Sequence, residues 1–406
     1  MHLSNKILIG LVLGVIVGLV VGPEGLGFAK KWVAPVGTLF INMIKMIIVP
    51  LVLASLIVGA CSLGDVRKLG RIGGKTVSFY LITTAIAVTI GIVVALVMSP
   101  GEGLKLPANA AYKGKEAPPI MDVIVNMVPT NVVKAMESAD MLQIIVFALF
   151  VGIGITLVGQ KAKPVEAFFD GLAEVTYKIV GIIMELAPYG VFALILPVVA
   201  ANGPKVLIPL AKVIGAVYIG CILHLAITYT TALKVVGGMS PIKFFKGILP
   251  AQMIAFSTCS SAATLPVTMK NTQENLGVSK EVSSFVLPLG ATINMDGTAI
   301  YQGASALFVA QVYGIDLSLS QMLIIVLTGT LASIGAAGVP GAGLIMLTLT
   351  LQSVGLPLEG IALIAGIDRI LDMARTTLNI TGDAVCAVFV QNSENKRAES
   401  TPSVSA

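Results

Sequence analysis

The sequence predicts an all-α polytopic membrane protein, because it is very apolar, poor in charge and rich in glycine. Of its 406 residues, 56% are hydrophobic and 12% are charged, and the mean hydropathy is +0.95. Soluble domains carry roughly twice that charged fraction. The 42 glycines suit helices that pack closely or break inside a membrane. The net charge of +5 is attributed to cytoplasmic loops, since no long basic run or aromatic-rich basic patch indicates nucleic-acid binding.

The first half of the chain is divided into ordinary membrane spans, each near the ~20 residues needed to cross a bilayer. They lie at about 5–22, 37–63, 77–99, 119–160, 165–199 and 204–234, and the fourth is long and broken. The segment at 7–21 has no small-residue cleavage site, which favours a first span over a signal peptide.

The basic loops set the orientation. They lie at 67–75, 161–163 and 243–246. Placing them in the cytoplasm puts the amino terminus there and the loop near 100–118 outside. The polar tail from Gln391 is expected to be disordered and cytoplasmic, so both termini of this cell-membrane protein are expected in the cytoplasm.

In the second half, from 241 to 391, polar and small residues interrupt the hydrophobic stretches. Segment 256–266 places a hydroxyl cluster between two short apolar arms, and segment 332–343 does the same with glycine. No arm is long enough to cross alone, so each segment predicts a re-entrant helical hairpin whose tip stays inside the protein. A pair of interrupted segments predicts inverted repeats with a binding site between them. Two glycine-rich packing spans are the alternative.

A stripe of charge marks the last hydrophobic segment. It consists of Asp368, Asp372, Arg375, Asn379 and Asp383, whose spacing places them on one face of a helix. Arg375 keeps its charge in the membrane and needs an anion, for which internal pairing with Asp372 is one possibility. A helix face with three acids and one arginine suits instead a bound zwitterion that carries an extra carboxylate. Arg375 would hold the side-chain carboxylate, Asp372 the ammonium group, and the hairpin tips the α-carboxylate.

A second polar interruption lies at Asn294, Asp296 and Gly297, which are poor helix formers in succession. A helix that unwinds there frees backbone carbonyls, and these hard oxygen ligands with the two side chains suit a cation. A kink satisfied by water is the alternative. We expect Asp368 to hydrogen-bond to this unwound segment, and His224 to be a packed, hydrogen-bonded residue rather than a catalyst.

Four linked motifs resemble one transporter family. They are NMDGT at 294–298, Ser260-Ser261, GVPGAG at 338–343 and DMARTTLN at 372–379. Together they closely resemble the glutamate/aspartate:cation symporters, also called the dicarboxylate/amino acid:cation symporters. The resemblance covers essentially the whole chain. It implies import of L-aspartate or L-glutamate with Na⁺ as the co-transported ion, no cofactor and no enzyme activity.

The resemblance also implies site residues. The substrate would be held by Ser260, Ser261, Thr298, Val339, Gly343, Asp372, Arg375, Thr376 and Asn379. One sodium ion would use Gly290, Asn294, Asn379 and Asp383; a second Thr292, Ser333, Ile334 and Ala336; a third Tyr80, Thr83, Thr84, Asn294 and Asp296. The second hairpin, with Val339 and Gly343, would act as the gate.

The family fold implies eight transmembrane helices, two re-entrant hairpins and a homotrimer working as an elevator in the cell inner membrane. The scaffold would comprise residues 1–70 and 101–200, and the second of these ranges includes the external loop. The transport domain would comprise residues 71–100 and 201–390. Residues 391–406 would form a disordered tail.

Departures from the family pattern leave alternatives open. Relatives carry an arginine at the position of Cys259 or of Met373, and here neither is filled, so Arg369 is the nearest candidate to balance Asp372. Gln302 stands where proton-coupled members have glutamate, which argues against a proton carrier there. A proton-coupled symporter and a C4-dicarboxylate carrier of the same fold remain alternatives. An ion channel or membrane enzyme is disfavoured, since no ring of polar groups or nucleophile–base pair is evident.

Overall fold

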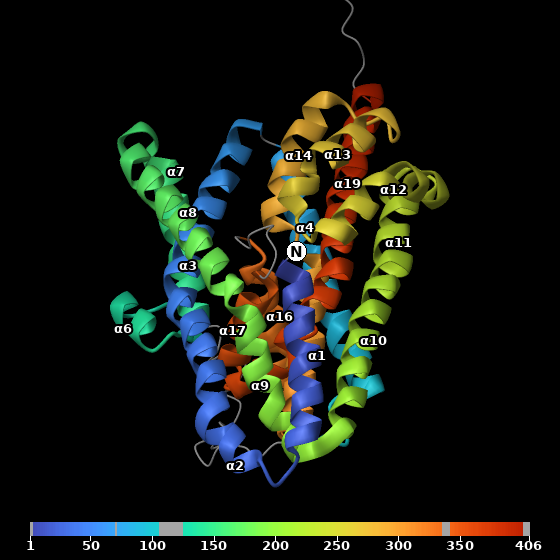
Figure 1. Cartoon of the computed structure of the whole chain (residues 1–406). Coiled ribbons are helices and arrows are strands. Elements are labelled where there is room, and N and C mark those ends of the chain that lie inside the picture. The colour runs from blue at the N-terminus through green and yellow to red at the C-terminus, as the bar shows by residue number, and fades with distance from the viewer. Residues whose placement is uncertain (1–2, 70, 105–124, 335–341, 401–406) are drawn as a thin grey trace, which may run out of the picture.

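The computed structural model describes residues 3–69, 71–104, 125–334 and 342–400, and their regular structure is helical throughout (Figure 1). The first half contains α1 (Leu3–Val21), α2 (Leu26–Phe28), η1 (Ala29–Val33), α3 (Ala34–Leu69), α4 (Arg71–Met98), α6 (Val132–Glu137), α7 (Met141–Val158), η2 (Gly159–Ala162), α8 (Lys163–Glu185) and α9 (Ala187–Asn202). The second half contains η3 (Gly203–Val206), α10 (Leu207–Leu223), η4 (His224–Tyr229), α11 (Thr230–Ala232), η5 (Leu233–Gly237), α12 (Pro241–Thr258), α13 (Ser261–Glu274), α14 (Lys280–Ile293), α15 (Asp296–Val312), α16 (Leu319–Ala332), α17 (Ala342–Ser353), η6 (Leu358–Gly360), α18 (Ile361–Ala365) and α19 (Asp368–Ser400).

The outer surface is apolar, as a bilayer requires. Three helical stretches of the described chain are long and apolar enough to cross a membrane: Ile72–Met98, Gln143–Ile183 and Gly203–Gly237. Large aliphatic side chains point outward from these and other helices, with Val20 81% and Val97 80% exposed. An aqueous surface does not favour such contiguous apolar side chains, whereas lipid does.

The helices pack in two groups. In one, α1 packs along α9, and α3 packs against α7, α8 and α9. In the other, α4 packs along α15 and also contacts α10 and α16, while α19 packs against α12, α14 and α15. Figure 1 shows the blue and green helices of the first group at the left and front, with α4, α12 and α19 of the second group on the other side.

Two expectations about elements need correction. The predicted single span at 165–199 is two helices, α8 and α9, which meet at Leu186. Pro188 is the second residue of α9, and a proline lacks the N–H that would continue α8. The tail expected to be disordered from Gln391 continues as helix to Ser400. It is held by Lys75, which binds Glu394 at 2.9 Å, and by Asn392, which donates to the Val236 carbonyl at 2.6 Å.

Both interrupted segments of the second half fold as helix pairs. Helices α12 and α13 pack together, and the Asn275 side chain donates to the Gly247 carbonyl at 2.8 Å. We call this pair hairpin 1. Helices α16 and α17 also pack together and form hairpin 2, whose connection at 335–341 lies outside the described residues, as does the external loop 105–124. The predicted helix break is confirmed: α14 ends at Ile293 and α15 begins at Asp296.

Candidate functional site

The charged stripe begins at the first residue of α19, and all five of its side chains are buried. Arg375 is completely inaccessible, although arginine is among the costliest side chains to bury. A completely buried charge requires partners, so the neighbours of Arg375 define the centre of the site.

Two carboxylates hold the Arg375 guanidinium. Its Nη1 donates to Asp368 Oδ1 at 2.8 Å, and its Nη2 lies 3.0 Å from Asp372 Oδ1. Internal pairing with Asp372 is therefore present, and Asp368 adds a second acid. The expectation that Asp368 bonds to the unwound segment was wrong, because its position one turn before Asp372 points it to the same guanidinium.

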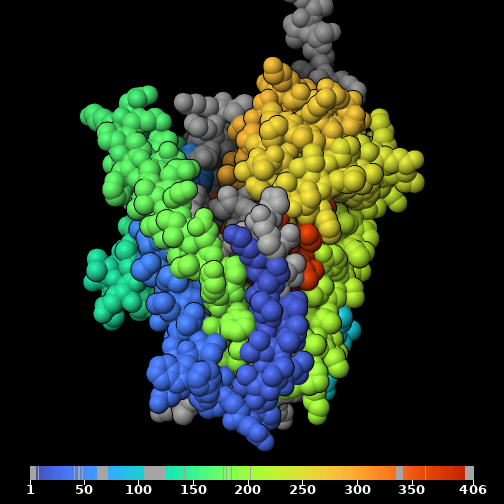
Figure 2. Space-filling view, viewed as in Figure 1, coloured from blue at the N-terminus to red at the C-terminus, as the bar shows by residue number. Residues whose placement is uncertain are grey.

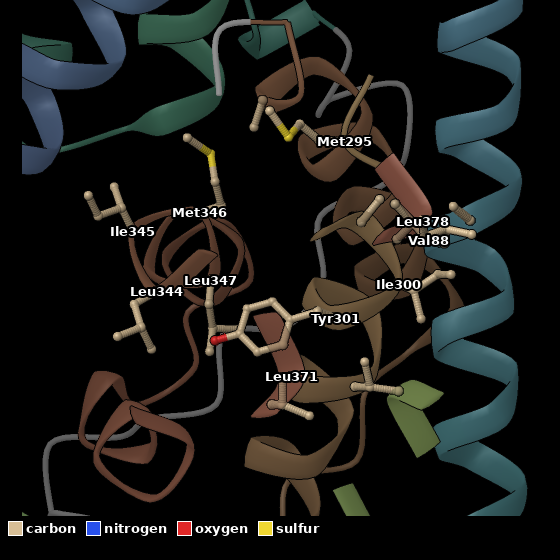
Figure 3. Packing of buried hydrophobic residues seen from close by; sticks show 14 of the residues in the cluster. Val88, Met295, Ile300, Tyr301, Leu344, Ile345, Met346, Leu347, Leu371 and Leu378 are labelled. Carbon is tan, nitrogen blue, oxygen red and sulfur yellow. The ribbon is translucent and has the colours of Figure 1, made fainter. Parts of the chain in front are cut away.

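The guanidinium also lies over the ring of Tyr301, 4.2 Å from the ring centroid, as in a cation–π contact. Figure 3 shows Tyr301 reaching from α15 toward Leu347 of α17, with Leu371 nearby. Among the described residues, Arg375 Nε donates no hydrogen bond, and Nη2 has an ion-pair contact without hydrogen-bond geometry. The guanidinium thus keeps N–H groups for a further acceptor.

Hairpin 2 reaches this guanidinium through a glycine. A Cβ atom on Gly343, the second residue of α17, would overlap Nη1 and Cζ of Arg375. Only glycine allows the backbone of hairpin 2 to approach so closely. The structure therefore brings predicted residue Gly343 against Arg375, while Val339 and Ala336 lie outside the described residues.

Asn379 joins α19 to the break between α14 and α15. Its Oδ1 accepts from the Gly297 backbone N–H at 2.7 Å, and its Nδ2 lies 3.2 Å from the sulfur of Met295. A Cβ on Gly297 would overlap the Arg375 backbone, so the start of α15 lies directly on the charged helix. Thr298 follows in the first turn and is buried.

A cluster of buried oxygen atoms lies one turn further along α19. Asn294 Nδ2 donates to Asp383 Oδ1 at 2.9 Å and to the Asn379 carbonyl at 3.1 Å. Gly290 closes the cluster, since a Cβ there would overlap Asp383 Oδ1 and the Tyr80 hydroxyl. Asn294 Oδ1 is buried and accepts no hydrogen bond among the described residues. An orphaned amide oxygen beside a carboxylate fits a hard cation such as Na⁺.

Asp296 forms the neighbouring cluster and is fully buried. Its Oδ1 accepts from Thr84 at 2.7 Å. Its Oδ2 accepts from the Tyr229 hydroxyl at 2.7 Å and lies 3.1 Å from His224 Nε2. His224 is thus a packed, hydrogen-bonded residue as predicted. Thr83 is also buried, but its hydroxyl donates to the Tyr80 carbonyl of its own helix.

Tyr229 was missed by the sequence analysis, and η4 explains its role. A π-helical turn closes i→i+5 hydrogen bonds, which brings residues five apart toward one face. His224 and Tyr229 are the first and last residues of η4, and their rings contact edge to face at 4.6 Å. Gly382 accommodates them, because a Cβ there would overlap the Tyr229 hydroxyl. A tyrosine five residues after the histidine was the only available signal.

Other predicted residues have local partners. Thr292 is exposed and donates to the Leu289 carbonyl, while Ser333 is buried and donates to the Thr330 carbonyl. Ile334 is also buried. Both hydroxyls therefore donate within their own helices. Thr376 donates to Asp372 Oδ1 at 3.3 Å.

Ser260 and Ser261 begin α13 at the tip of hairpin 1. Ser260 is the N-cap, whose Oγ accepts from the Ala263 N–H at 3.2 Å, and Ser261 is buried. Arg369, expected to balance Asp372, instead donates from Nη2 to the carbonyls of Ser257 and Thr258 at 3.0 and 3.3 Å. That expectation was wrong because the last carbonyls of α12 have no helical partner and attract a donor.

The fold and site define a multi-pass membrane transporter with charged and oxygen-rich clusters buried among apolar helices. The sequence pattern of one family, described as the Sodium:dicarboxylate symporter family, matches residues 3–393. The chain belongs to this family, so it is a symporter and not an enzyme, as the sequence predicted.

Several bacterial relatives align over nearly the whole chain. The proton/sodium-glutamate symport protein of Geobacillus stearothermophilus is 38% identical, over 98% of this chain and 96% of the relative. The proton/glutamate-aspartate symporter of Escherichia coli (strain K12) is 38% identical, over 97% and 93%. The C4-dicarboxylate transport protein of Bacillus subtilis (strain 168) is 35% identical, over 97% and 94%.

Proposed function

We propose that this protein imports L-aspartate or L-glutamate together with Na⁺. The observation that carries the proposal is the buried Arg375, held between Asp368 and Asp372 with Gly343 of hairpin 2 against it. A permanent cation flanked by acids recognises a ligand bearing both signs of charge. The names of the glutamate and glutamate-aspartate relatives support the same substrate class.

In this proposal, the substrate side-chain carboxylate displaces an acid from the guanidinium of Arg375. Asp372 then turns to the substrate ammonium group. Thr376 donates a hydrogen bond to the Asp372 carboxylate and stabilises its position. Asn379 and the start of α13, at Ser260 and Ser261, donate to the α-carboxylate, as a helix N-terminus does. Hairpin 2 closes on the ligand through Val339 and Gly343, and Thr298 lies beside the side-chain carboxylate.

Sodium would use the oxygen clusters next to the substrate. The first ion would bind at Gly290, Asn294, Asn379 and Asp383, supported by the orphaned Asn294 oxygen. The third would bind at Asp296 and Thr84 with Tyr80, Thr83 and Asn294, supported by the buried carboxylate. The second would bind at Thr292, Ser333, Ile334 and Ala336, where the hydroxyls of Thr292 and Ser333 donate within their own helices and keep oxygen lone pairs for an ion. Asn379 belongs to both substrate and ion sites, which couples their occupancies.

A C4-dicarboxylate substrate is the second candidate, favoured by the relative that transports such acids. A dicarboxylate without an amino group gains nothing from Asp372, which argues against it. Proton coupling is the other alternative, and Gln302 argues against a carboxylate carrier at that position.

We further propose the family architecture for this chain: eight transmembrane helices, two re-entrant hairpins, inverted repeats, both termini in the cytoplasm and a homotrimer. The two packing groups support a scaffold of spans 1, 2, 4 and 5 and a transport domain of spans 3, 6, 7 and 8 with both hairpins. The transport domain would slide as an elevator relative to the scaffold.

Uptake into proteoliposomes tests the function. Labelled L-aspartate, L-glutamate and succinate are supplied under a sodium gradient or a proton gradient imposed separately. We expect sodium-driven accumulation of the amino acids and little of succinate. Asp372→Asn should abolish aspartate uptake in the same vesicles. Accumulation of succinate that survives this substitution would favour the dicarboxylate carrier, and accumulation driven only by protons would reject sodium coupling.

A further inference from the structure

Arg369 is a charged residue that the proposed site does not use. It follows Asp368 at the start of α19 and is half-buried. Among the described residues, no carboxylate lies within ion-pair distance of its guanidinium. Its hydrogen bonds go instead to the last two residues of α12, at the tip of hairpin 1.

The two carbonyls that Arg369 binds lie at the carboxyl end of a helix. Ser257 and Thr258 end α12, and their carbonyl groups have no partner within the helix. In a hairpin that ends inside a membrane protein, such groups need a donor from another element. A guanidinium also complements the negative end of the helix dipole. Arg369 therefore satisfies and neutralises the end of α12 in a single contact.

The next residue shows how tightly the tip turns. Cys259 has φ of +55°, in the left-handed region that a side chain other than glycine rarely adopts. Ser260 then caps α13, and Ser261 is its first residue. The turn that Arg369 holds is therefore the turn that aims the start of α13, the part of the site assigned to the α-carboxylate.

Before a substrate binds, the charges of Arg375, Asp368 and Asp372 sum to zero only when Arg369 is included. Arg375 faces Asp368 and Asp372, so these three residues leave one negative charge. An acidic amino acid brings two carboxylates and one ammonium group, and Arg375 serves only one of those carboxylates. Figure 2 shows a small part of α19, in red, at the surface between α1 and hairpin 1. Arg369 adds a positive charge at the tip of hairpin 1, where it binds the Ser257 and Thr258 carbonyls.

From these observations we propose that Arg369 is the positioning residue of the α-carboxylate subsite. It fixes the hairpin 1 tip through the Ser257 and Thr258 carbonyls, and its charge stabilises the substrate α-carboxylate at Ser260 and Ser261. The arginine thus acts from α19, although the hairpin tip itself carries Cys259. This inference rests on the proposed function, because it assumes an amino-acid substrate with an α-carboxylate.

Two substitutions separate charge from hydrogen bonding. Arg369→Gln keeps an N–H donor for the carbonyls and removes the charge, whereas Arg369→Lys keeps both. The dissociation constant of L-aspartate is measured by calorimetry on the purified protein in sodium, with the unfolding temperature of each variant. Lys246→Gln is the matched control, because it removes one exposed positive charge from α12, about 18 Å from the tip of hairpin 1.

We expect Arg369→Gln to weaken aspartate binding at least tenfold, and Arg369→Lys and Lys246→Gln to remain within about threefold of the wild type. Equal dissociation constants for Arg369→Gln and Arg369→Lys, whether weakened or not, would overturn the proposal, since charge would then play no part. Failure of the wild type to bind both L-aspartate and L-glutamate would instead reject the proposed function, so the two failures are distinguishable.

Discussion

At the residue scale, the site depends on glycines that lie so close to a neighbouring helix that a side chain would not fit. Gly343, Gly297 and Gly290 each lie where a single added carbon would overlap Arg375, Asp383 or Tyr80. These glycines bring backbone against the backbone or the polar side-chain groups of other helices. Their role is therefore close approach rather than flexibility.

The substitution Gly343→Ala tests that close approach. The added methyl group overlaps the guanidinium of Arg375, which must shift or push hairpin 2 away. We expect about a tenfold loss of aspartate affinity, equivalent to ~1.4 kcal/mol. Gly154→Ala on α7 is the control, because a Cβ there meets nothing within 4 Å, and helical alanine is favoured over glycine. Affinity is measured by calorimetry, and equal affinities for both variants would contradict this account.

At the element scale, the π turn η4 determines how Asp296 is compensated. It presents His224 and Tyr229 to one carboxylate oxygen, while Thr84 of α4 donates to the other. A regular α-helix would place residues five apart on different faces. The π turn therefore brings together the two partners that complete the buried cluster around Asp296.

Tyr229→Phe removes one of these donors without changing the shape of the ring. Loss of a hydrogen bond to a buried carboxylate costs about 1–3 kcal/mol, so the unfolding temperature should fall in sodium-free buffer. If sodium binds at Asp296, saturating sodium should reduce the difference, because the ion compensates the carboxylate. Tyr189→Phe, on a ring that is 68% exposed, is the matched control. A loss of stability that sodium does not change would contradict a cation site at Asp296.

At the scale of the whole molecule, the proposed elevator requires the two packing groups to slide past one another. They touch where Gly366, between α18 and α19, faces Leu11 of α1 and Val191 of α9. We expect a crosslink between Leu11→Cys and Gly366→Cys, in a background without native cysteines, to stop uptake and leave aspartate binding intact.

The control pair joins Gly14→Cys on α1 to Ile195→Cys on α9, two residues in contact within one group. Its crosslink should leave uptake unchanged. Continued uptake with the Leu11–Gly366 pair fully crosslinked would reject a relative movement of the two groups. Mass spectrometry measures the extent of each crosslink, and a reductant should restore transport.

Residue patterns alone predicted that this chain is a membrane symporter with a charged face on its last helix. Burial of charge in an apolar segment is costly, so polar residues there are visible without coordinates: Arg375, Asn379, Asp296 and the helix break at Asn294 were all predicted. Spacing along one helix also predicted which side chains share a face. These properties are local in the chain, and local patterns reveal them.

The partners of those side chains became evident only from the packing of the helices. Asp368 binds Arg375 rather than the unwound segment, and Arg369 binds the end of α12 rather than Asp372. Tyr229 reaches Asp296 through a π turn that no residue pattern announced. The division of 165–199 at Leu186 and the helix beyond Gln391 also depend on packing. Partner choice depends on the distances between elements far apart in sequence, which spacing within one helix does not contain.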